Sequence, residues 1–221
     1  ESTFAFGLND LWGENKIDRM ELARVGQRTE HKYIGVMCGI MDQAISCLGR
    51  KGSLLRLDCR SGEYEYFPWN PKGYQLVLVN SCVKHTLAGS PYNERRLQCE
   101  HVAEIIGQKH PEVKSLRDAS IEMLEEVKGE ITGDEYKRAR YVIGEVERVL
   151  AVCDALKNDD YEMVGKMMYE THYGLSKEYE VSCEELDFLN DVAKEAGVTG
   201  SRIMGGGFGG CTINLVAEEL V

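Results

Sequence analysis

The chain has 221 residues, of which 43% are hydrophobic and 29% are charged, a composition typical of a globular protein with a sizeable core. Its formal net charge of −11 excludes a general binder of nucleic-acid backbones, because such binding needs clustered Lys and Arg side chains. No apolar run approaches the roughly 20 residues that cross a bilayer and the first residues lack a secretory signal, so we expect no membrane partner and a cytoplasmic location.

The first third of the chain has the pattern of three helices followed by a β-hairpin. Apolar residues that recur every three or four positions predict helices over 2–11, 18–32 and 41–48. Asp18 and Glu21 have the spacing of a capping box at the start of the second helix. Apolar and β-branched runs on either side of Ser61 and Gly62 predict two strands, over 53–58 and 64–67.

Two prolines and a glycine within 68–73 interrupt regular structure and divide the chain into parts 1–72 and 73–221. The second part begins with a predicted apolar strand at 74–80 and ends with another at 211–217. Between them, helical spacing predicts five helices, over 92–108, 115–128, 134–156, 161–173 and 182–196. The fold class is therefore α+β, with helices outnumbering strands in the second part.

Several polar residues predict structure without chemistry. The eight cysteines include no Cys-x-x-Cys pair, which argues against a zinc or redox motif and favours reduced thiols. The five histidines show no metal-ligand spacing and no dyad. Ser182 and Glu185 have the spacing of a capping box, and we expect Arg95 and Arg96 on a solvated helix face.

Asp42 is the first candidate for chemistry, because it follows a glycine turn at the start of the predicted 41–48 helix. Phosphoryl transfer to a hydroxyl benefits from a carboxylate that accepts the proton late or orients the attacking oxygen. Asp is also a common helix cap, and from spacing alone a cap is the simpler interpretation.

The second candidate is the run GGGFGG at 205–210, directly before the last predicted strand. Glycine lets the backbone take positive φ and approach a ligand closely, and successive amides can form an anion-binding nest. No Gly-Lys-Ser/Thr follows, and a strand stands where a dinucleotide-binding loop needs a helix, so neither a Walker loop nor a Rossmann fingerprint fits. A tight turn that serves only packing is the alternative.

Four strings in this order resemble the galactokinase family of the GHMP sugar-kinase superfamily: CGIMDQ at 38–43, GSPYNERR at 89–96, YEVSCEELD at 179–187 and SRIMGGGFGG at 201–210. The resemblance covers essentially the whole chain. It implies a two-lobed GHMP-kinase fold, in which 1–72 is the back part of an N-terminal α/β lobe. Residues 73–221 would then be a helix-rich, ferredoxin-like C-terminal lobe.

The resemblance implies an ATP-dependent sugar 1-kinase that phosphorylates the anomeric hydroxyl of α-D-galactose. Asp42 matches the proposed catalytic base of that family and contacts the sugar, together with Gly39 and Tyr92. Relatives usually have Ser-Glu-Tyr where this chain has Ser90-Pro91-Tyr92, so the local geometry around Tyr92 is the less secure part of the match.

On the phosphate side, the resemblance implies ATP and Mg²⁺. Glu30 matches a carboxylate associated with the magnesium ion, and Lys84, beside His85, matches a basic residue near the phosphates. An exposed helical ion pair and a solvated loop lysine are the respective alternatives. The residues that match a motif bordering the phosphate loop are Gly205, Gly206 and Gly207.

The resemblance also implies that the chain is an internal fragment of a monomeric, cytoplasmic enzyme that binds a small sugar and ATP. Galactokinases have an earlier motif with most of the sugar contacts and a serine-rich loop whose amides cradle the phosphates, and neither string occurs here. We therefore expect the isolated chain to show negligible turnover and weak ATP binding, because positioning supplies most of the catalysis in phosphoryl transfer.

Two other functions fit the same residues. One is a related sugar kinase, such as an N-acetylgalactosamine kinase. The other is a non-catalytic sensor that binds galactose and ATP, which differs from the enzyme mainly in the serine-rich loop. Asp42 favours the enzyme over the sensor.

Overall fold

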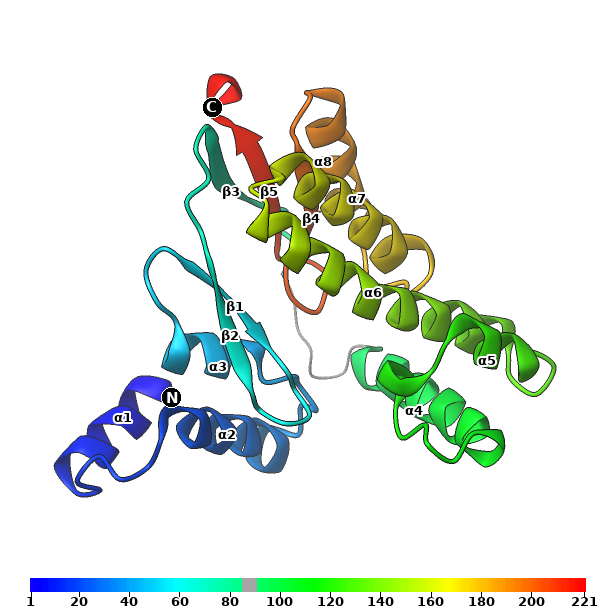
Figure 1. The fold of residues 1–221 in the computed structure, drawn as a ribbon, viewed down its shortest axis with the longest axis horizontal. Coiled ribbons are helices and arrows are strands. Elements are labelled where there is room, and N and C mark those ends of the chain that lie inside the picture. Colours follow the sequence, from blue (N-terminus) through cyan, green and yellow to red (C-terminus); the bar gives the residue numbers. More distant parts are fainter. Residues whose placement is uncertain (85–90) are drawn as a thin grey trace. The chain divides into compact units, whose positions relative to one another are not determined.

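The computed structural model describes residues 1–84 and 91–221, and none of the helices in these two ranges has the length and apolar character needed to span a bilayer. Helices and strands together form two compact units, Glu1–Asn70 and Pro71–Val221 (Figure 1). Helix predominates over strand, and the expected α+β class is confirmed.

The first unit consists of helices covered by a hairpin. Its elements are α1 (Ser2–Leu11), α2 (Arg19–Thr29), the π-helix η1 (Glu30–Ile34), α3 (Met41–Leu48), β1 (Ser53–Leu57) and β2 (Tyr64–Pro68). The two strands pair antiparallel, with Leu55 opposite Tyr66. Buried residues of α2 and α3, among them Leu22 and Leu48, form the core, and Leu55 and Leu57 of the hairpin pack against it.

The second helix begins as the sequence predicts but ends differently. The Asp18 carboxylate caps α2 by accepting from the Glu21 amide at 2.9 Å. The Glu21 carboxylate pairs with Arg28 at 2.9 Å, so the expected capping box is made in one direction. At Glu30 the helix widens into the π-turn, which ends at Gly35 with a left-handed φ of 79°.

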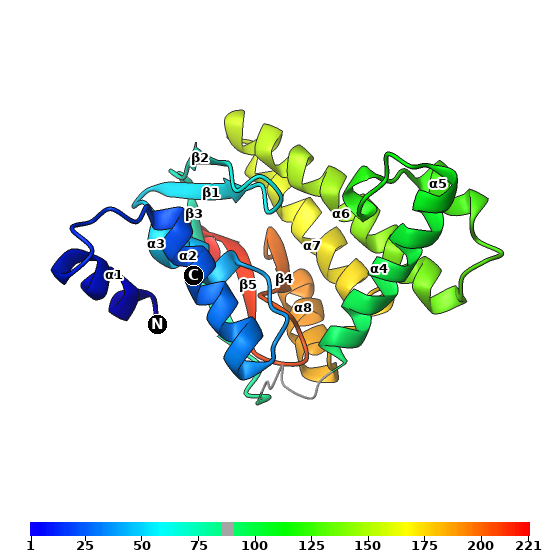
Figure 2. The ribbon, with the colours of Figure 1, turned by 90° about the horizontal axis from the view of Figure 1, so that it is seen from below.

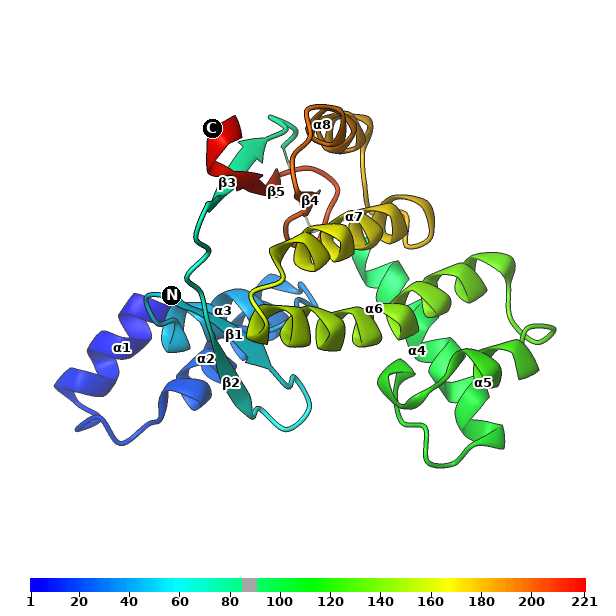
Figure 3. The same ribbon diagram turned by 45° about the horizontal axis from the view of Figure 1, so that its top comes forward.

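The second unit places helices against a small sheet. Its elements are β3 (Tyr74–Asn80), α4 (Tyr92–Lys109), the 3-10 turn η2 (Leu116–Asp118), α5 (Ile121–Glu126), α6 (Gly133–Lys157), α7 (Tyr161–Lys177), α8 (Glu184–Glu195), β4 (Gly200–Ile203), β5 (Cys211–Ala217) and the 3-10 turn η3 (Glu218–Leu220). The sheet is antiparallel, with strand order β3-β5-β4. Helices α7 and α8 pack on β4, and α6 runs alongside α7 (Figure 3).

The long helices of this unit share a second cluster of apolar side chains away from the sheet. Figure 2 shows α4 and α5 gathered around α6. Val102 and Ile106 of α4, Leu124 of α5 and Ile143 of α6 are all buried there. Thr132 and Glu135 form a complete capping box that starts α6.

Three expectations about this unit are wrong. The predicted 115–128 helix is two short pieces, because Ala119 is extended and Ser120 starts a new helix by capping Met123. The Ser182 and Glu185 capping box does not form, because α8 begins after Cys183 and the Ser182 hydroxyl donates to Asp187 at 2.5 Å. Strand β4 was not expected, because its four residues are too few to show alternation.

Two glycines let α7 approach β4 closely. A Cβ on Gly165, inside α7, would stand 2.1 Å from the Thr199 carbonyl oxygen. A Cβ on Gly200, the first residue of β4, would stand 2.4 Å from the Cα of Gly165. Neither position therefore has room for a side chain, and helix and strand are in backbone contact.

We predict that Gly165→Ala lowers the free energy of unfolding by about 1–3 kcal/mol, because the added methyl group must push α7 away from β4. Denaturant unfolding followed by circular dichroism measures this. Gly133→Ala is the matched control, because the Gly133 side has nothing within 4 Å and lies at the start of α6. Equal stabilities of the two variants would contradict the close-packing argument.

Candidate functional site

Asp42 lies on the first turn of α3 and is exposed. The residue at the N-cap position is Ile40, and no side chain caps this helix. The structure therefore contradicts the interpretation of Asp42 as a cap and leaves its carboxylate directed to another purpose.

The Asp42 side chain lines an open pocket of about 330 Å³ within the first unit. The other lining residues come from α3 and from the start of α1: Gln43, Ser46, Glu1, Ser2, Thr3 and Phe6. The volume is within the range of small-molecule sites. A ligand of sugar size could therefore reach the carboxylate from the side on which α1 begins.

The loop before α3 is anchored by two side chains of the preceding helix. His31 Nε2 lies 2.9 Å from the carbonyl oxygen of Cys38, and Gln27 Nε2 donates to the same oxygen at 3.2 Å. Beside this anchor, Gly39 is exposed, and a Cβ there would meet nothing within 4 Å. The anchor fixes the backbone that leads to Asp42, while the space next to Gly39 stays open.

Glu30 and Asp42 belong to the same neighbourhood. The pKa of the Cys38 thiol is raised, first by burial, then by the Glu30 carboxylate and, more weakly, by the Asp42 carboxylate. Two predicted site residues twelve positions apart thus act electrostatically on one thiol. Glu30 also opens the π-turn, a local irregularity that is frequent at functional sites.

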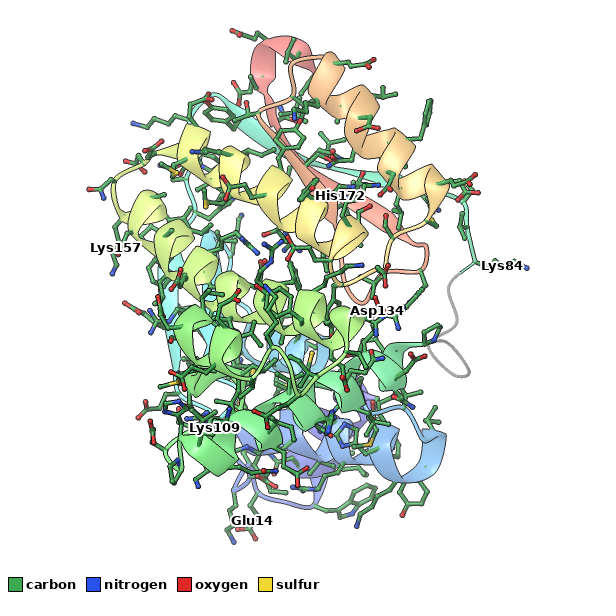
Figure 4. All side chains as sticks on the ribbon, turned by 90° about the vertical axis from the view of Figure 1, so that its right-hand side faces the viewer. Glu14, Lys84, Lys109, Asp134, Lys157 and His172 are labelled. Carbon is green, nitrogen blue, oxygen red and sulfur yellow. The ribbon has the colours of Figure 1, made fainter. Side chains whose placement is uncertain are left out.

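In the second unit, the segment after β3 and the glycine run before β5 lie side by side. The Ser81 amide donates to the carbonyl of Gly210 at 2.9 Å, and the Gly210 amide donates to the carbonyl of Val83 at 3.4 Å. Lys84 follows directly, exposed, with a side chain that extends away from the ribbon (Figure 4). Two predicted phosphate-side elements, separated by more than a hundred residues, are therefore neighbours.

The glycine run divides into a packed part and an open part. Gly207, with φ 83°, has no room for a Cβ, which would stand 2.1 Å from the carbonyl oxygen of Val181. Gly209 is similarly close to Val83, at 2.8 Å. Gly205 is exposed with nothing within 4 Å of a Cβ position, and Gly206 is half-buried. Packing therefore explains the second half of the run, while the first half is accessible to a ligand.

Tyr92 is the first residue of α4 and is half-buried. It lies near Tyr179, whose pKa is raised by burial, by Cys99 and, to a smaller extent, by Tyr92. The neighbouring His85, with the first two residues of the 89–96 string, lies outside the described residues.

Sequence reasoning missed two buried polar groups. Arg95, expected on a solvated face with Arg96, is 9% exposed. The signal was present in the helical period, because Arg95 shares a face of α4 with the buried Val102 and Ile106. His172, on α7, lies 3.3 Å from Asp187, and burial lowers its pKa despite that carboxylate (Figure 4).

Comparison with known proteins gives matches over both units. The family model for the GHMP kinases N-terminal domain matches residues 1–50, and that for the GHMP kinases C-terminal region matches 153–220. Galactokinase of Bos taurus is 45% identical over 195 residues, which cover 88% of this chain and 48% of the bovine protein. Galactokinase of Thermotoga petrophila is 40% identical and covers 100% of this chain and 63% of that protein.

Solved structures agree. Lactococcus lactis galactokinase complexed with galactose has a TM-score of 0.90 and 35% identity, over 99% of this chain and 56% of that one. L. major mevalonate kinase, at 18% identity and a TM-score of 0.59, shares the fold. The chain spans about half the length of the bovine relative and of these two structures. With both family models matched and these relatives, the chain belongs to the GHMP kinase superfamily, and within it the similarity is to galactokinases.

Proposed function

We propose that the protein to which this chain belongs transfers the γ-phosphate of ATP to the anomeric hydroxyl of α-D-galactose, giving galactose 1-phosphate. The observation that carries the proposal is the Asp42 carboxylate, exposed, unused as a cap and lining a pocket of about 330 Å³. The sugar assignment rests on the galactokinase relatives and on the Lactococcus lactis structure complexed with galactose.

In this proposal Asp42 accepts the proton of the anomeric hydroxyl late in the transfer and holds that oxygen in line with the γ-phosphate. The Cys38 carbonyl, held by His31 and Gln27, fixes the loop, so that the carboxylate does not have to be ordered when the sugar binds. The open side of Gly39 leaves room for the sugar ring, and the Tyr92 hydroxyl supplies a further hydrogen bond to it.

Glu30 is the residue that we propose to bind Mg²⁺. Magnesium usually takes one or two protein carboxylates and completes its coordination with phosphate oxygens and water, so one half-buried carboxylate suits it. This agrees with the finding that no cluster of three or more potential ligands exists within residues 1–84 and 91–221. Bound magnesium would neutralise charge on the ATP phosphates.

Lys84 and the accessible first half of the glycine run, Gly205 to Gly207, are the proposed contacts on the phosphate side. The Lys84 ammonium would act as a point charge, and exposed loop amides would donate to phosphate oxygens. The same proposal includes a monomer in the cytoplasm with reduced thiols, and the eight cysteines are free in the structure.

We predict that Asp42→Asn lowers kcat for galactose phosphorylation by about a hundredfold or more, because the amide cannot accept the proton. Sugar affinity should remain, because the amide keeps the size of the carboxylate. A coupled ADP-release assay of the whole protein measures turnover, and calorimetry measures sugar binding. Asp10→Asn, an exposed carboxylate on α1, is the control.

Unchanged turnover of Asp42→Asn would remove the role assigned to Asp42. Preferred turnover of N-acetylgalactosamine in a competition assay would change the substrate. Binding of galactose and ATP without any turnover by the unmodified protein would identify a sensor instead of an enzyme.

We also predict that His31→Phe speeds hydrogen exchange in residues 35–40, because one of the two bonds to the Cys38 carbonyl is lost. A loss of about 1 kcal/mol corresponds to a roughly fivefold faster exchange. His31→Gln, which can donate to the same oxygen, should restore protection. His101→Phe, an exposed ring in the second unit, is the control, and equal exchange in all three variants would refute the anchor.

A further inference from the structure

The segment between α7 and α8, residues 178–183, contacts two of the proposed functional elements at once. We call it the connecting segment. Arg95 of α4 donates to the carbonyl of Tyr179 through Nε at 2.9 Å and to the carbonyl of Glu180 through Nη2 at 3.4 Å. The next carbonyl, that of Val181, accepts from the Phe208 amide of the glycine run at 2.6 Å. Three successive carbonyls are thus shared between α4 and the glycine run.

Arg95 is placed to hold this segment rigidly. Its side chain is 11% exposed, and its charge is met by these carbonyls and by Glu94 at 3.5 Å. A buried guanidinium needs such partners, and a change that removes it leaves buried carbonyls without a donor. A flexible surface arginine would have neither constraint.

The connecting segment carries an unusual backbone that must be held from several sides. Glu180 is left-handed, with φ 56°, although it is not glycine. Its carboxylate pairs at 3.0 Å with Arg138, which is 4% exposed. At the other end, the Ser182 hydroxyl donates to Asp187 at 2.5 Å.

The glycine run follows the connecting segment because no space separates them. The position of the Val181 carbonyl sets the position of Gly207, where even a methyl group would stand 2.1 Å from that oxygen. Arg95 also lies one helical turn after Tyr92, whose Pro91 neighbour accepts the Arg95 amide at 3.0 Å. A shift of the connecting segment is therefore transmitted to the loop and to the first turn of α4.

We propose that Arg95 is a positioning residue, which ties the first turn of α4 to the glycine run 205–210 through the connecting segment. This rests on the proposed kinase function, because it assigns the two elements to the sugar side and the phosphate side of one reaction. Arg95 thereby sets the position of both sides, without contacting either substrate.

The test compares Arg95→Met with Arg96→Met in the whole protein. Arg96 lies on the same helix and pairs with Glu100 at 2.7 Å on the exposed surface, so it is a matched control. Loss of the Arg95 bonds should speed hydrogen exchange in peptides covering 178–183 and 204–211 by about tenfold or more. Exchange in α6 should stay unchanged, and Arg96→Met should match the unmodified protein.

Kinetics give a readout that simple loss of stability would not. Arg95→Met should raise KM for both the sugar and ATP, with kcat/KM reduced about tenfold or more at temperatures where the protein is folded. Arg95→Lys, which keeps the charge but lacks the planar fork, should fall between the two. If Arg95→Met does not fold, Arg95→Lys and Asp187→Asn, which loosens the opposite end of the segment, are compared instead.

Unchanged exchange in 204–211 would overturn the proposal, as would a KM change for the sugar alone. The exchange measurement requires no turnover, so it decides the coupling even if the protein phosphorylates no sugar. Absence of turnover in the unmodified protein would count against the proposed function only.

Discussion

The pairing of β3 with β5 is the contact on which the second unit depends. These strands lie at opposite ends of the unit's sequence, with Val77 opposite Asn214, and α4 to α8 lie between them in the chain. Asn214 strengthens the pairing from inside, since its buried side chain donates to the Val77 carbonyl at 3.0 Å. Because Asn80 faces Cys211, the pairing also brings the segment after β3 against the glycine run. A long-range strand contact thereby builds the local surroundings of Lys84.

The elements predicted from the sequence are those whose signals are local. The helices at 2–11 and 41–48 and the strands at 74–80 and 211–217 have the predicted bounds, because spacing, turns and apolar runs specify them directly. The 115–128 pattern failed because Ser120 competes for its backbone as a cap. Only the tertiary structure could reveal that Ser182 pairs with Asp187 and does not begin the helix.

The candidate site shows the same division. Asp42, Gly39 and Glu30 were identified by motif, and the structure adds the pocket beside Asp42 and the anchor at Cys38. Arg95 was misplaced because an arginine is usually exposed, although the helical period put it on the buried face. The glycine run could not be assigned to packing or to ligand binding from composition, and the structure divides it between open space at Gly205 and close contact at Gly207.

The π-turn at Glu30–Ile34 has a consequence for how the length of this region can vary. Its widened ring is closed by the Gly35 amide, which donates to the carbonyl of Glu30 at 2.9 Å, so the turn holds one residue more than a regular helix would. Removing one residue there would regularise the helix but turn whatever follows by about 100°. The chain entering Gly39 would then leave the helix in another direction. Homologous insertions and deletions should therefore avoid this stretch, even though much of its surface faces solvent.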